Sequence, residues 1–519
     1  MSDGSVQQRQ PQPAVPLLQE QRVGEILAAV PERRYWLYRP RRVGMVWRSR
    51  TFRIAAVCTV LALCGLAILA LVRDQTGTEG FLVGLGLAVL PVPLLMAAFR
   101  WLDRVDPAPW RNLLFAFAWG AFAAALIALT ANSFAMRWMA TANPSNADTL
   151  GATVIAPVVE ESAKAAAVLL VFLFRRREFN GIVDGVVVAG FTASGFAFTE
   201  NILYLGNAFG EDQQIGTAGV VSVTAATFFV RAVLSPFTHP LFTVLTGIGF
   251  GLAAVSARRQ RFRRIGWPLL GLVLAMGMHA LWNGSASYSP YGFYAVYGVF
   301  MVPVFGLVTW LAIWSRQREL RTLAAELPAY AAAGWLTPAE PLALSSMRAR
   351  GMARDAARRH VAAAGNSWEG PYGGPGHPSM YGPGHPPAYR PFPEVRTKSQ
   401  DTKQIKAQIK AQGKAAARTV AEYESFATSL ASLRRQARRG AVGPDFTARE
   451  LELLHHLWQR RDVAAPALTY AAQATGRLRP SYPPPPPWGF PAPYPQHYTG
   501  HNPYLLPPRQ QTGNGPAQL

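Results

Sequence analysis

Cysteine is nearly absent from this sequence. Two occur among 519 residues, Cys58 and Cys64, and both lie within the first long apolar run. Because they are six residues apart, they lie on different faces of a helix and are poorly placed to pair. This scarcity excludes a disulfide framework and a zinc site built from cysteines.

The sequence signatures of several hydrolase classes are also absent. There is no His-Glu-x-x-His run of the zinc peptidases and no Gly-x-Gly-Asp run of the aspartyl intramembrane proteases. Ser194-Gly195 is present, but Thr192 stands where the rhomboid Gly-x-Ser-Gly pattern requires glycine. A hydrolytic site in this chain would have to use other residues.

Long apolar runs are plentiful, and they are confined to about residues 54–314. A run of about 20 apolar residues is long enough to cross a bilayer as a helix, and several such runs exclude an ordinary soluble enzyme. We expect an all-α fold, a polytopic membrane helix bundle of about eight spans with helical and disordered cytoplasmic tails. The predicted spans are 54–72, 81–99, 113–131, 152–174, 182–205, 236–256, 267–285 and 293–314.

One further apolar stretch, residues 217–235, carries a single Arg231. The loop before it is predicted to be external and the loop after residue 256 is strongly basic, so 217–256 must cross an odd number of times. Ser235-Pro236 is typical of a helix start, with a capping serine and proline at the first helical position. We therefore expect 217–235 to be re-entrant or interfacial and 236–256 to be the span.

Positive charge follows the predicted topology. The loops at 100–112, 175–181 and 257–266 are rich in arginine, while the alternate loops are neutral or acidic. By the positive-inside rule the basic loops are cytoplasmic, which places both termini in the cytoplasm of a cell-membrane protein. This orientation explains much of the net charge of +22, and no nucleic-acid recognition module is present.

The regions outside the spans differ in composition. We expect a basic N-terminal segment at 1–53, a membrane domain at 54–315 and a helical cytoplasmic extension at 316–365. A Gly/Pro-rich linker at 366–399 and a Pro-rich tail at 476–519 are predicted to be disordered, with a second helical segment at 400–475 between them.

Ionisable side chains inside spans are the main functional signal, because charge is expensive in a bilayer. Counted from the cytoplasmic helix ends at about 1.5 Å per residue, four such places lie roughly 18 to 27 Å deep. Helices running in opposite directions thus bring their polar residues to one level, which indicates one site. The residues are Glu160, Glu161, Lys164, Glu200, Asn201, His239 and His279.

This inventory fits hydrolysis within a membrane, which needs a base for water, an acid for the leaving amine and a stabiliser of the oxyanion. Glu160 and Lys164 are spaced for an intrahelical ion pair, so Glu161 is the favoured base. Asn201 can donate its amide to the developing charge. Alternatively His239, His279 and Glu200 can hold Zn²⁺, the ligand set of many zinc hydrolases.

Two composite motifs in this order resemble the PrsW family of bacterial intramembrane proteases. They are Glu-Glu-x-x-Lys at 160–164 and Phe-x-x-x-Glu-Asn at 196–201, followed by membrane histidines at 239 and 279. The resemblance covers about residues 80–315, and the family is distantly similar to the CAAX prenyl protease superfamily. It implies proteolysis of a single-pass membrane protein, with site-1 cleavage of an anti-sigma factor as the family's best-known role. It leaves a zinc mechanism and a metal-free glutamate mechanism both open.

Two other functions compete with proteolysis. Buried Glu, His and Lys side chains also form proton relays, so a proton-coupled transporter or channel is the main alternative, although no clear inverted repeat is present. A non-catalytic membrane scaffold is the third, and the motifs argue against it.

Overall fold

The structure is a computed structural model. It describes Pro16, Leu18, Gly443 and residues 49–142, 145–175, 179–257, 259–288, 291–366, 398–440 and 445–478. Every secondary-structure element in these ranges is a helix, which confirms the predicted helical membrane bundle. The segments expected at 1–53, 366–399 and 476–519 fall almost entirely outside the described residues.

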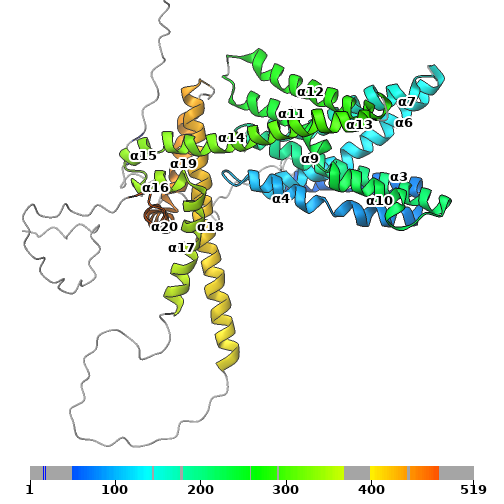
Figure 1. The fold of residues 1–519 in the computed structure, drawn as a ribbon. Coiled ribbons are helices and arrows are strands. Elements are labelled where there is room, and N and C mark those ends of the chain that lie inside the picture. The colour runs from blue at the N-terminus through cyan, green and yellow to red at the C-terminus, as the bar shows by residue number, and fades with distance from the viewer. Residues whose placement is uncertain are drawn as a thin grey trace, which may run out of the picture. The chain divides into compact units, whose positions relative to one another are not determined.

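The membrane region begins with α3 and ends with α14 (Figure 1). Its larger elements are α3 (Arg50–Val89), α4 (Val92–Leu102), α5 (Trp110–Ala118), η2 (Trp119–Ala124), α6 (Ala125–Ala142), α8 (Ala156–Phe174), α9 (Ile182–Ile215), α11 (Thr238–Val255), α12 (Arg261–Tyr288) and α14 (Val302–Glu326). Shorter elements between them are α7 (Ala147–Leu150), η3 (Gly151–Ile155), η5 (Gly219–Val221), α10 (Val223–Phe228), η6 (Phe229–Leu234), α13 (Gly292–Ala295) and η7 (Val296–Met301).

Six helical stretches among the described residues are long and apolar enough to cross a membrane. The predicted spans 54–72 and 81–99 fall within one of them, Thr51–Leu102, where Gly77 interrupts α3 with φ 71° and ψ 168°. Only glycine adopts such a backbone readily. The predicted span 152–174 corresponds to α8, a 19-residue helix that carries Glu160, Glu161 and Lys164.

The expected re-entrant stretch 217–235 contains α10 and the π-helical segment η6, neither of which has a buried residue. The following helix, α11, begins at Thr238 with Phe237 as its N-cap residue. The predicted start at Ser235-Pro236 was therefore early. The Ser235 hydroxyl instead donates to the carbonyl of Val230, 2.6 Å away, and closes the end of η6.

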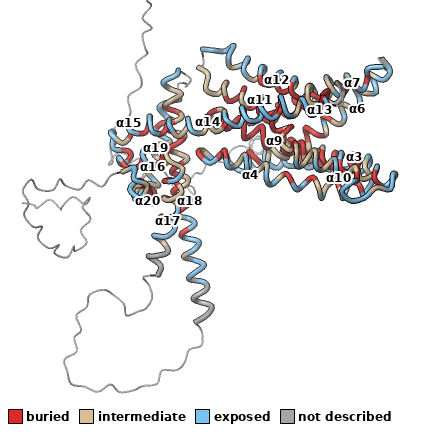
Figure 2. The backbone as a smooth tube through the Cα atoms, in the orientation of Figure 1, coloured by how far each residue is buried: buried red, intermediate tan, exposed pale blue. Residues whose placement is uncertain are grey.

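Helix α9 is the core of the membrane region and lies between α11 and the α3–α4 pair (Figure 1). In its most apolar 18-residue segment, 89% is buried. The corresponding segments of Thr51–Leu102 and Arg261–Ser285 are 17% and 22% buried. Figure 2 shows the same contrast as a continuous buried α9 among helices with exposed outer faces. The exposed apolar side chains are the surface that a bilayer would cover.

Close packing of α9 depends on glycine. A Cβ on Gly185 would lie 2.0 Å from the carbonyl oxygen of Gly247 in α11, and one on Gly195 would lie 2.1 Å from that of Phe117 in α5. Both positions accept only a hydrogen, so neighbouring helices approach α9 at backbone contact. This fixes the helix that carries Glu200 and Asn201.

The C-terminal helices pack around a second core. They are α15 (Pro328–Ala332), α16 (Ala339–Leu344), α17 (Met347–Asn366), α18 (Lys398–Arg438), α19 (Phe446–Trp458) and α20 (Arg461–Ala474). Val105, between α4 and α5, is part of this core. The buried Arg350 donates to the carbonyl of Val105 at 2.7 Å and to the hydroxyl of Thr428 at 2.9 Å. The helices of 316–365 and 400–475 thus pack together.

Candidate active site

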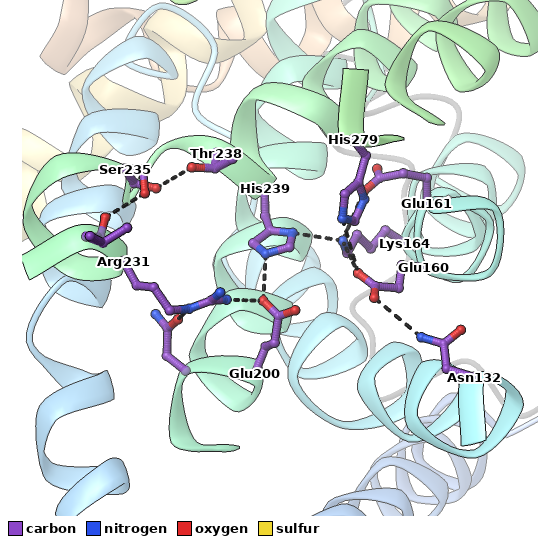
Figure 3. A network of polar contacts seen from close by, with 12 residues as sticks. Asn132, Glu160, Glu161, Lys164, Glu200, Arg231, Ser235, Thr238, His239 and His279 are labelled. Carbon is purple, nitrogen blue, oxygen red and sulfur yellow. Dashed lines mark hydrogen bonds and ion pairs between the residues drawn. The ribbon is translucent and has the colours of Figure 1, made fainter. Parts of the chain in front are cut away.

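The predicted polar residues meet where α8, α9, α11 and α12 converge (Figure 3). Helix α8 contributes Glu160, Glu161 and Lys164, and α9 contributes Glu200 and Asn201. One histidine comes from each of the other two helices, His239 from α11 and His279 from α12. Their imidazole rings are 5.4 Å apart between centroids. The sequence alone had placed these residues only at a common depth.

Lys164 lies at the centre of the cluster and is fully buried. Its Nζ is 2.9 Å from Glu161 Oε1, 3.3 Å from Glu160 Oε2 and 3.1 Å from His239 Nδ1. The ammonium also lies 3.7 Å from the centroid of the Phe196 ring. A buried ammonium requires such partners, because it has lost its hydration shell. Lys164 therefore contacts residues from three helices, α8, α9 and α11.

Each histidine is oriented by its own carboxylate. His279 Nδ1 lies 3.2 Å from Glu161 Oε1, and His239 Nε2 lies 2.6 Å from Glu200 Oε2. An ionised carboxylate can only accept, so these ring nitrogens are the ones that carry hydrogen. The other nitrogen of each ring then carries a lone pair, and that of His239 Nδ1 accepts from Lys164 Nζ at 3.1 Å. This is the arrangement that orients histidine ligands in metal sites.

One ligand atom each from Glu160, His239 and His279 lies within 4.8 Å of the others. Two imidazoles and one carboxylate are a donor set that suits Zn²⁺, so the residues fit a metal ion. The sequence analysis had named Glu200 as the carboxylate of this triad. In the structure Glu200 lies on the Nε2 side of His239, and Glu160 takes that place instead.

Glu160 and Glu161 differ in access. Glu161 is 0% exposed, and its second oxygen accepts a hydrogen bond from the Thr243 hydroxyl at 2.9 Å. Glu160 lines a cavity of about 140 Å³ between α3, α6 and α9, and Asn132 Nδ2 lies 3.5 Å from its Oε1. The expectation that Lys164 would pair with Glu160 and leave Glu161 free does not match this geometry. Lys164 is closer to Glu161.

Arg231 is the site residue that the sequence analysis did not select. Its Nε donates to Asn201 Oδ1 at 2.7 Å, and its Nη2 donates to Glu200 Oε2. The guanidinium carbon lies 3.9 Å from the centroid of the Tyr204 ring. A lone arginine in the apolar stretch 217–235 was the available signal.

A larger cavity of about 260 Å³ lies on the other side of these residues. Arg231, Asn201 and His239 line it, together with apolar side chains such as Trp282 and Phe293. Polar and apolar groups therefore line the cavity beside the histidines in similar measure.

The part of the chain that carries this cluster is similar to known proteins. Residues 108–308, which contain all of its members, match the PrsW family, described as intramembrane metalloproteases. The chain is 25% identical over 197 residues to Protease PrsW of Clostridioides difficile (strain 630), covering 38% of this chain and 76% of the relative. It is 31% identical over 107 residues to Protease PrsW of Geobacillus kaustophilus (strain HTA426), covering 21% of this chain and 40% of the relative.

A third relative is Protease PrsW of Bacillus subtilis (strain 168), which is 33% identical over 125 residues, covering 24% of this chain and 49% of the relative. No solved structure gives a significant match. The resemblance first noted in the Glu-Glu-x-x-Lys and Phe-x-x-x-Glu-Asn motifs is thereby confirmed, since residues 108–308 match the PrsW family of intramembrane metalloproteases and three PrsW proteases are similar to this chain.

Proposed function

We propose that the cluster on α8, α9, α11 and α12 hydrolyses peptide bonds of membrane proteins. The observation that carries the proposal is the buried meeting of Glu160 with two histidines, each held by a further carboxylate. Such a site supplies proton transfer and charge stabilisation where bulk water is excluded. The family match favours this function over the transporter alternative.

Glu160 is the carboxylate that takes the proton of the attacking water. It borders the smaller cavity, and its contacts with Lys164 and Asn132, at 3.3 and 3.5 Å, are longer than the two 2.9 Å contacts of Glu161 with Lys164 and Thr243. Water attacks the carbonyl carbon, Glu160 receives its proton, and the same proton then passes to the departing amine. Lys164 and the Asn201 amide oppose the negative charge that develops on the carbonyl oxygen.

In the alternative mechanism Glu160 would be a ligand and not the base, and together with His239 and His279 it would hold a metal ion. The ion would supply a polarised, more nucleophilic water and Lewis-acid stabilisation of the carbonyl oxygen. Glu160, Glu161 and Glu200 carry three formal negative charges against two positive charges on Lys164 and Arg231, which leaves one net negative charge in the cluster.

The substrate is a single-pass membrane protein, and the family resemblance points to a membrane-anchored anti-sigma factor cut on its extracytoplasmic side. Predicted depths in the outer half of the bilayer support that geometry. The basic loops support cytoplasmic termini in the cell membrane. The chain's partners are thus the bilayer and the substrate.

The test is cleavage by the purified full-length protein in proteoliposomes. A panel of single-pass membrane proteins, anti-sigma factors included, would be labelled at both ends and the products identified by mass spectrometry. Wild type and Ser162→Ala should cleave, since Ser162 is exposed on the same helical turn, and Glu160→Gln should not. Failure of folded wild type to cleave any member, with and without added zinc, would count against a protease.

A further inference from the structure

The only described cation on the face of the larger cavity is Arg231, which η6 supplies from outside the four helices that carry the rest of the site. Its side chain is 22% exposed and reaches Glu200 on α9 (Figure 3). It also contacts Asn201 and Tyr204 on the same helix. An arginine so placed lies between the cavity and the acidic residues of the site.

The chemistry of guanidinium fixes the orientation of the Asn201 side chain. Arginine has donors and no acceptor, so only the oxygen of the carboxamide can face Arg231 Nε at 2.7 Å. The NH₂ group of Asn201 must then point away from the guanidinium. Asn201 also lines the larger cavity, where a donor is useful to a carbonyl oxygen.

The same guanidinium acts on His239 through Glu200. Arg231 Nη2 and His239 Nε2 both contact Glu200 Oε2. The other nitrogen of His239 contacts Lys164. A loss of Arg231 would therefore reach the orientation of His239 as well as that of Asn201.

We propose that Arg231 is a positioning residue of the hydrolytic site. It turns the Asn201 amide so that its NH₂ donates to the carbonyl oxygen of the peptide, and it holds Glu200 against His239. This inference rests on the proposed function, and it adds a residue outside the family motifs at 160–164 and 196–201.

Lysine cannot take over this role. Its ammonium is a point charge, whereas guanidinium presents donors in a planar fork that meets two acceptors at once and stacks on an aromatic ring. Arg231→Lys therefore keeps the positive charge beside Glu200 and loses the simultaneous hold on Asn201. The substitution isolates geometry from charge.

The experiment is a double-mutant cycle with the full-length protein and a cleaved member of the labelled panel. Asn201→Ala should lower kcat by about 100-fold, the usual cost of one oxyanion donor, and Arg231→Lys by about 10- to 100-fold with little change in KM. In the Asn201→Ala background, Arg231→Lys should cost less than about threefold, because residues that act as a unit are not additive. Arg73→Lys is the matched control, since exposed Arg73 contacts only Thr78 in the hydrogen bonds described.

Rescue separates positioning from folding. Arg231→Ala should regain activity when millimolar guanidinium is added, and sodium at the same ionic strength should not restore it. Additive losses in the cycle, a rise in KM alone, or no rescue of folded Arg231→Ala would overturn the positioning role while wild type still cleaves. If wild type and Arg73→Lys cleave nothing, the proposed function and the role of Arg231 both fail.

Discussion

Replacing Glu160 and Glu161 separately by glutamine distinguishes the two adjacent carboxylates. Glutamine keeps the shape of the side chain and removes its basicity. For Glu160 we expect kcat to fall by about 10²- to 10⁴-fold, the usual contribution of a general base, with little change in KM. That loss corresponds to about 3 to 5 kcal/mol in the activation free energy.

Glu161→Gln should act differently, because Glu161 holds the site together. Its carboxylate accepts from Lys164 at 2.9 Å, from His279 at 3.2 Å and from Thr243 at 2.9 Å. A glutamine has one acceptor oxygen, so at least one of these donors loses its partner. A hydrogen bond to a charged group contributes about 1.5 to 3 kcal/mol, and we expect a loss of that order in the free energy of unfolding.

The assay combines single-turnover cleavage in proteoliposomes with thermal unfolding of the same preparations. Glu160→Gln should lose activity and keep most of its stability, while Glu161→Gln should lose both, and Ser162→Ala should lose neither. Cleavage by Glu160→Gln at near the wild-type rate would refute the assignment of Glu160 as the base.

Three further predictions address the metal, pH and topology. If Glu160, His239 and His279 hold zinc, elemental analysis should find it in active wild type and not in His239→Ala or His279→Ala; full activity of metal-free protein would instead leave glutamate-based hydrolysis. Burial raises the pKa of Asp103 from 3.8 to about 7, so the folded state binds a proton more tightly than the unfolded chain. The free energy of unfolding should fall as pH rises from about 4 to 7, and Asp103→Asn should flatten that slope in thermal melts. Reporter fusions at Asp74 and Arg261 should report opposite sides of the membrane, and same-side signals would contradict the orientation.

The helical bundle was predictable because a bilayer imposes apolar runs of about 20 residues that hydropathy detects directly. The site residues were predictable for the same reason, since ionisable side chains such as Glu161 and His279 are conspicuous within those runs. The interruption of α3 at Gly77 could not be predicted, because its positive φ is visible only in the structure.

The partners of each site residue could not be predicted from the sequence. Thr243 lies 82 residues from Glu161, and Arg231 lies 30 residues from Asn201, so no local spacing links them. The choice between Glu160 and Glu161 had the same difficulty. Adjacent residues on a helix point about 100° apart, and only the packing of α8 decides which of them meets a cavity.

The position of Arg231 on η6 bears on when, during substrate entry, the site has its hydrolytic geometry. Segment η6 has no buried residue, whereas α9 is fixed by backbone contacts at Gly185 and Gly195. If a substrate helix enters beside η6, it would displace that segment more easily than α9, and Arg231 would then withdraw from Glu200. The site would then be inactive while η6 is displaced, and it would regain its hydrolytic geometry only after the substrate is enclosed. Membrane proteins that contact η6 without being enclosed would not be cleaved.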